Sequence, residues 1–102
     1  MMDDGSLNEY IDAGVTDAKE MKVLNKLLED GEAKNAKGAL SIKSYGDRMG
    51  NTRKMNNDSR NKWTKTMKND FVKEGYKNRS SKLAKESMNK VDSYWKIKQD
   101  MK

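Results

Sequence analysis

The chain contains no cysteine, no histidine and no proline among its 102 residues. Without cysteine it can form no disulfide and offers no thiolate to a metal ion or a substrate. Without histidine it lacks the side chain that most often serves as a general base and as a metal ligand. We therefore expect a protein that is not an enzyme and that binds no metal, no cofactor and no small-molecule substrate.

Long apolar runs are also absent, and aliphatic residues are few. Leu, Ile, Val and Phe together account for 14 of the 102 residues, and the mean hydropathy is −1.17. No run is long enough for a membrane span or a signal peptide, so we expect no membrane contact and a cytoplasmic location, or the host cytoplasm or a virion if the chain is viral. Eight Met, two Trp and four Tyr residues supply additional apolar surface. The sequence predicts one domain with a modest core, which a partner or self-association would complete.

The residues that are present follow a helical pattern. β-Branched residues are few, no segment alternates polar and apolar side chains for long, and apolar residues recur three or four positions apart. Glycines fall where helices are expected to stop. We predict helices over residues 7–13, 17–30, 34–49, 59–74 and 80–100, with a polar, Asn-rich linker over 51–58. The predicted fold is a single all-α domain over residues 1–102, a small bundle of four to five helices with short antiparallel connections.

Signals for helix starts support three of these segments. Ser6 and Glu9 fit a capping box, and Thr16 is a candidate N-cap for the second helix. Asp58 or Ser59 is expected to cap the helix that follows the linker. In the segment 34–49, small residues such as Gly46 would permit another helix to pack closely.

Charge divides the chain into an acidic half and a basic half. Residues 1–50 carry seven Lys or Arg against ten Asp or Glu, whereas residues 51–102 carry fifteen against six. A local excess of one sign costs self-repulsion unless an anion neutralises it, and nucleic acid is the commonest such anion. The basic half, which comprises residues 59–102 after the linker, is therefore the best indication of a partner.

The basic side chains are expected on the solvent faces of the last two helices. Helical spacing places them opposite the apolar stripes, and too few carboxylates accompany them to balance their charge. The candidate contacts to nucleic-acid phosphates are Arg53, Lys54, Arg60, Lys62, Lys65, Lys82 and Lys85. The alternative interpretation is that these residues only form the solvated face that any amphipathic helix needs.

Two aromatic residues lie close to basic ones and are candidates for stacking on a base. Trp63 falls on the apolar stripe of its helix, so we expect it in the core. Tyr76 follows a predicted helix end and adjoins Lys77 and Arg79. Tyr76 and Arg79 are therefore the better candidates for contact with nucleic acid.

Other familiar sites are not supported. A helix-turn-helix centred on Gly14 would place Tyr10 at the tight crossing between the helices and Glu20 at an apolar position, in the acidic half of the chain. The carboxylate clusters lack calcium-loop spacing, and no glycine-rich phosphate loop or nucleophile elbow is present. We therefore do not expect a major-groove-binding helix, a metal site or catalysis.

The last predicted helix has an apolar arc that is wide for a small domain to cover. Met and aromatic residues are frequent at interfaces, so part of this arc is a candidate contact with a protein partner or a second copy. The candidate interface residues are Met88, Val91, Trp95 and Met101. The alternative is that they belong to the core.

These observations favour a non-enzymatic binding protein. Its basic C-terminal helices are expected to contact nucleic acid or a nucleoprotein mainly through phosphates. The alternative is a protein-interaction module, such as a small inhibitor or accessory factor of a phage or mobile element, or a subunit of a virion or other assembly.

Overall fold

The computed structural model describes the backbone of residues 4–101 and the side chains of residues 7–101. Within this part of the chain there are five α-helices, one short 3-10 helix and no strand. The elements are α1 (Asp4–Asp12), α2 (Ala18–Glu29), α3 (Ala36–Met49), η1 (Thr52–Lys54), α4 (Asn57–Lys73) and α5 (Ser80–Asp100). The predicted all-α class with four to five helices is therefore confirmed. No described helix has the length and apolarity needed to cross a membrane.

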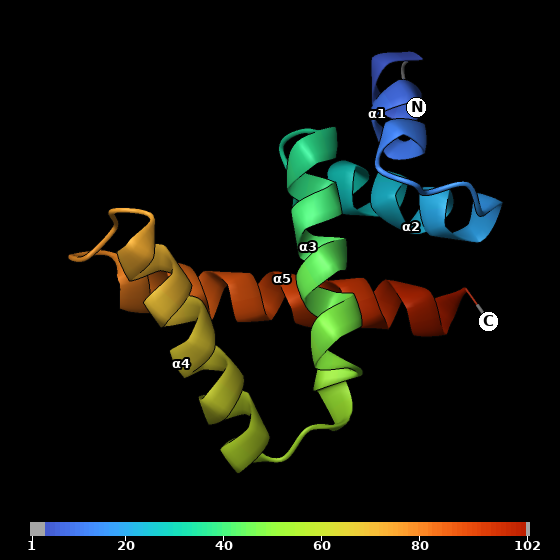
Figure 1. Ribbon diagram of the computed structural model, residues 1–102. Coiled ribbons are helices and arrows are strands. Elements are labelled where there is room, and N and C mark those ends of the chain that lie inside the picture. The colour runs from blue at the N-terminus through green and yellow to red at the C-terminus, as the bar shows by residue number, and fades with distance from the viewer. Residues whose placement is uncertain (1–3, 102) are drawn as a thin grey trace.

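The longest helix, α5, is the element around which the others are arranged. Figure 1 shows α5 running across the molecule, with α3 crossing it and α4 inclined along its N-terminal part. Helix α5 packs against α2, α3, α4 and η1, whereas α1 packs against α3. Helix α3 crosses α5 steeply, and the two helices approach closely at one small residue, described below.

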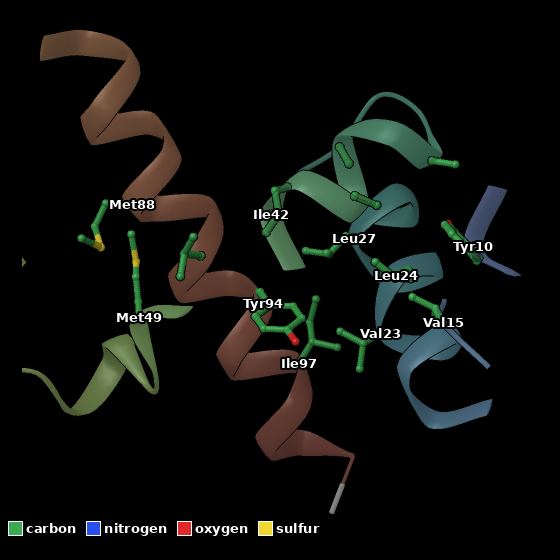
Figure 2. Packing of buried hydrophobic residues seen from close by; sticks show 14 of the residues in the cluster. Tyr10, Val15, Val23, Leu24, Leu27, Ile42, Met49, Met88, Tyr94 and Ile97 are labelled. Carbon is green, nitrogen blue, oxygen red and sulfur yellow. The ribbon is translucent and has the colours of Figure 1, made fainter. Parts of the chain in front are cut away.

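The core is built from one side of each helix. Its fully or nearly buried residues include Tyr10, Val15, Val23, Leu24, Leu27, Ile42, Met49, Met67, Met88, Val91, Tyr94 and Ile97. Figure 2 shows Met49 of α3 beside Met88 of α5, and Tyr94 and Ile97 between α5 and the α2–α3 side of the core. Methionine and tyrosine thus occupy positions that aliphatic residues fill in richer cores.

Asparagine and aspartate cap α2, α3, η1 and α4, and two of these caps lie one to three residues from the positions predicted. Asp17 rather than Thr16 caps α2, where its carboxylate accepts a hydrogen bond from the Lys19 amide at 2.7 Å. Asn56, before the predicted Asp58 or Ser59, caps α4 by accepting from the Ser59 amide at 2.9 Å. Both corrections have the same cause: the side-chain oxygen must reach an amide two or three residues ahead, and the preceding loop decides which residue is placed to do so.

Two further sequence predictions concern the ends of the early helices. Ser6 lies inside α1, which includes Asp4, so it does not cap that helix. The expected stops are confirmed at four glycines with positive φ, which are Gly14, Gly31, Gly50 and Gly75. The segment 51–58 is more ordered than a plain linker, because it holds η1 and the first residues of α4.

The crossing of α3 over α5 is centred on Gly46. The Trp95 indole N–H donates to the Gly46 carbonyl oxygen at 3.1 Å. A Cβ atom added to Gly46 would lie 2.6 Å from Cε2 of Tyr94, which is closer than real side chains approach. The absence of a side chain therefore lets the two helices meet, as the small residues in this segment predicted.

Asp47, next to this crossing, links α3 to α5 by polar contacts. The Tyr94 hydroxyl donates to its carboxylate at 2.6 Å, the Lys43 ammonium donates at 2.7 Å, and the Lys98 ammonium lies 3.9 Å away. Burial raises the pKa of Asp47, but the hydrogen bonds from Lys43 and Tyr94 outweigh it and hold the pKa below its usual value. Burial, and then the hydrogen bond to this carboxylate, raise the pKa of Tyr94 far above that of a free tyrosine. The cluster therefore favours a charged Asp47 and a neutral Tyr94.

Candidate functional site

The outer face of α4 carries basic and polar side chains. Lys62, Lys65, Asn69 and Lys73 are exposed, while Met67 on the opposite side is fully buried. At 1.5 Å per residue, Lys62 and Lys73 are separated by about 16 Å along the helix axis. The lysine face predicted from helical spacing is therefore formed as expected.

The outer face of α5 has the same character. Lys82, Lys85, Asn89 and Lys96 are exposed. Their opposite side is buried, with Val91 only 1% exposed. Because α4 and α5 pack together, the two basic faces belong to one helical hairpin, seen at one side of the molecule in Figure 1. We refer to residues 57–90 as the basic hairpin.

The basic hairpin holds most of the excess charge of the molecule. It carries ten Lys or Arg against four Asp or Glu, and the whole chain has a net charge of +6. Within the described part of the chain, Lys62, Lys65 and Lys85 have no carboxylate within ion-pair distance, and Lys82 meets Glu86 only at 4.0 Å, with both side chains exposed. An exposed pair of that kind contributes little stability. The described carboxylates of the acidic half therefore form no ion pair with these lysines.

Arg60 lies in the hairpin, but its guanidinium forms hydrogen bonds within the fold. Its guanidinium donates to both carboxylate oxygens of Asp92 at 2.9 Å and to the carbonyl oxygen of Thr52 at 3.1 Å. The hydrogen bond to Asp92 raises the pKa of Arg60. This fork-shaped contact joins α4 to α5 and η1, so we assign Arg60 to the structure and leave it out of the candidate surface.

Arg53 and Lys54 lie apart from the lysines at the start of α5. Both are exposed on η1, and Arg53 donates to the Gln99 side chain at 3.0 Å. Gln99 follows Lys85 by fourteen residues, which is about 21 Å along α5. The predicted residues therefore do not form one compact cluster.

Tyr76 lies in the turn that joins the two helices of the hairpin. It is 45% exposed, and Lys77 and Arg79 beside it are exposed as well. Trp63, in contrast, is half-buried and packs against the core, in agreement with its predicted position on the apolar stripe. The structure thus leaves Tyr76, and not Trp63, as the aromatic residue at the basic surface.

The predicted apolar interface on α5 is only partly accessible. Met88 and Val91 are 3% and 1% exposed, so in this fold they are core residues. Trp95 is half-buried and hydrogen-bonded to Gly46, and Met101 is half-buried beside Lys98 and α2. The arc looked too wide for a small domain because the sequence does not reveal that four elements cover α5.

The sequence analysis did not identify two lysines of the basic hairpin or the contacts of Asp47. Lys68 and Lys90 extend the basic hairpin and were identifiable from the charge pattern alone. Asp47 also contacts Tyr94 and Lys98, which are 47 and 51 positions away, and no local pattern predicts such contacts. No group of three or more acidic side chains placed to hold a metal ion is found among the described residues.

Comparison with known proteins adds no assignment. No family model, curated protein or solved structure matches this chain. The function is therefore inferred from the geometry and charge of the molecule itself.

Proposed function

We propose that this chain is a non-enzymatic binding protein whose basic hairpin engages nucleic acid, free or within a nucleoprotein, mainly through phosphates. The observation that supports the proposal is the set of exposed lysines on the outer faces of α4 and α5, where Lys62, Lys65 and Lys85 form no ion pair and Lys82 meets Glu86 only at 4.0 Å. Phosphates are the natural counter-charge, because releasing their condensed counterions drives binding.

The types of side chain favour contact with the backbone over readout of base sequence. Lysine presents a flexible point charge, and the outer faces of α4 and α5 display no arginine for the bidentate contact that distinguishes guanine, since Arg60 is held by Asp92. Asn69 and Asn89 lie among the lysines and offer amide groups to phosphate or sugar oxygens. We therefore expect binding with weak sequence preference.

The decisive experiment is a salt titration of binding to a labelled oligonucleotide. If about six phosphates are neutralised, affinity falls about a thousandfold or more between about 50 and 200 mM salt. Affinity that stays flat over this range would contradict the proposal.

A charge-matched pair of variants locates the site. Changing Lys62, Lys65, Lys82 and Lys85 to Glu is expected to abolish binding. The control changes four exposed lysines outside the hairpin, Lys19, Lys22, Lys34 and Lys37, to Glu, and so alters the net charge equally. Equal losses in both variants would indicate attraction to net charge without a defined surface. If the protein keeps its biological activity after the four hairpin lysines are changed to Glu, the alternative, a protein-interaction module, is favoured.

A further inference from the structure

The turn of the basic hairpin exposes an aromatic ring that contact with phosphates does not use. Among the described residues, Tyr76 and Ile11 are the two large hydrophobic side chains that are exposed, at 45% and 47%. Ile11 lies in the acidic half, whereas Tyr76 lies between the ends of two lysine-rich helices. We infer that Tyr76 stacks on an unpaired base, so that the protein prefers single-stranded nucleic acid; this inference rests on the proposed function.

The backbone holds Tyr76 in a defined position. Helix α4 ends in a Schellman motif, in which the Tyr76 amide donates to the Phe71 carbonyl oxygen at 2.9 Å and the Gly75 amide donates to Val72 at 3.0 Å. The Tyr76 carbonyl oxygen in turn accepts from the Arg79 amide at 3.0 Å. A platform fixed on both sides loses little conformational entropy when a ligand binds.

The contact with Phe71 covers only part of the Tyr76 ring. The two ring centroids are 6.4 Å apart in a T-shaped arrangement, which is the apolar contact that accompanies this helix ending. An aliphatic residue would serve the same purpose. The exposed remainder of the ring is what a base can cover.

The surroundings of Tyr76 suit a base attached to phosphates. An open hollow of about 440 Å³ is lined by Val72, Gly75, Tyr76, Lys77, Asn78 and Arg79. This volume is in the range of small-molecule sites, which is about 300 to 1,000 Å³. Asn78 can hydrogen-bond a base edge, and Lys77 and Arg79 can meet flanking phosphates.

Base stacking distinguishes a single strand from a duplex. In a duplex each base already lies between its neighbours, so an aromatic side chain can reach a base face only after unstacking it. In a single strand the base faces are accessible, and every base offers one, so the contact tolerates any sequence.

The test compares oligonucleotides of about 12 nucleotides as single-stranded DNA, as single-stranded RNA and as the corresponding DNA duplex, by fluorescence anisotropy. Tyr76→Leu keeps the apolar contact with Phe71 but has no aromatic face. It is expected to weaken single-strand binding roughly five- to a hundredfold and duplex binding less than about twofold. Tyr76→Phe keeps the ring and is expected to bind as the unchanged protein does. Ile11→Ala, an exposed apolar residue in the acidic half, serves as the control.

The outcomes separate this inference from the proposed function. Single-strand binding that is unchanged in Tyr76→Leu, or lost equally for single strand and duplex, would overturn the stacking role while the lysine surface still stands. If the unchanged protein binds none of the three oligonucleotides, the proposed function itself fails. A loss of binding that is confined to single-stranded DNA or to single-stranded RNA supports stacking and identifies which of the two the protein binds. Circular dichroism of each variant checks that the helices are intact.

Discussion

Gly46 carries only a hydrogen atom as its side chain, and this lets α3 and α5 cross in close contact. Gly46→Ala is expected to destabilise the protein by about 1 to 3 kcal/mol, because the new methyl group would overlap the Tyr94 ring. Urea unfolding followed by circular dichroism measures the change.

Gly38 in the same helix is the matched control. A Cβ there would lie 3.5 Å from Oδ1 of Asn35, an ordinary contact. Gly38→Ala is expected to stabilise by about 0.5 to 1 kcal/mol, since alanine restricts the unfolded chain more than glycine does. Destabilisation by both substitutions would mean that crowding at the crossing is not the cause.

Asp47 makes stability depend on pH at the acidic end. Its pKa in the folded chain is below the unfolded value, so its charged form stabilises the fold above about pH 4, the ordinary aspartate pKa. This stabilisation is lost as the pH falls through the folded pKa. Asp47→Asn is expected to lower stability at pH 7 and to flatten the decline in the unfolding free energy between about pH 5 and 2. Asp12→Asn, which removes an exposed carboxylate outside this cluster, should leave the decline as it is.

At the scale of elements, Arg60 holds α4, η1 and α5 together. Arg60→Ala is expected to cost about 1 to 3 kcal/mol of stability, because Asp92 loses two charge-assisted hydrogen bonds. Lys62→Ala, two residues away on the exposed face, should not lower stability but should weaken oligonucleotide binding. Thermal unfolding and anisotropy on both variants provide the comparison. A stable Arg60→Ala protein with impaired binding would place the guanidinium at the nucleic-acid surface after all.

The helices were largely predictable because their signals are local. The final helix, predicted over residues 80–100, is observed as Ser80–Asp100, and Gly75 ends α4 as its position indicated. The lysine faces follow from the same spacing, which fixes the direction of each side chain once the buried stripe is known.

The contacts between helices were not predictable, because they depend on how elements far apart in sequence meet. Trp95 and Gly46 are separated by 49 positions, and neither carries a signal for the other. Arg60 was assigned to phosphate because the sequence does not show that Asp92, 32 positions away, faces it. The same limit led to the interface assignment of Met88 and Val91.

At the scale of the whole molecule, acidic and basic residues are concentrated at opposite ends. Residues 4–32 carry three Lys or Arg against eight Asp or Glu, whereas the basic hairpin has the opposite excess. Figure 1 places α1 and α2 at one side of the molecule and the turn between α4 and α5 at the other. At about 0.1 M salt, charges more than about 10 Å apart are largely screened, so attraction between the two ends does little to relieve repulsion within the hairpin.

Added salt is therefore expected to stabilise the protein. The unfolding free energy should rise between about 20 and 300 mM NaCl, because screening reduces repulsion among the hairpin lysines. The variant with Lys62, Lys65, Lys82 and Lys85 changed to Glu should show a smaller rise. Urea titrations at each salt concentration measure it, and stability that falls with salt would show that attractive pairs dominate instead.

The central place of α5 affects how the chain is made. Translation produces α2, α3 and α4 before the helix against which all three pack. At about 5 to 20 residues per second, a ribosome needs roughly one to four seconds to add the 21 residues of α5. Until α5 has been made, the apolar sides of the earlier helices lack the partner that covers them, and exposed apolar surface of this kind favours aggregation.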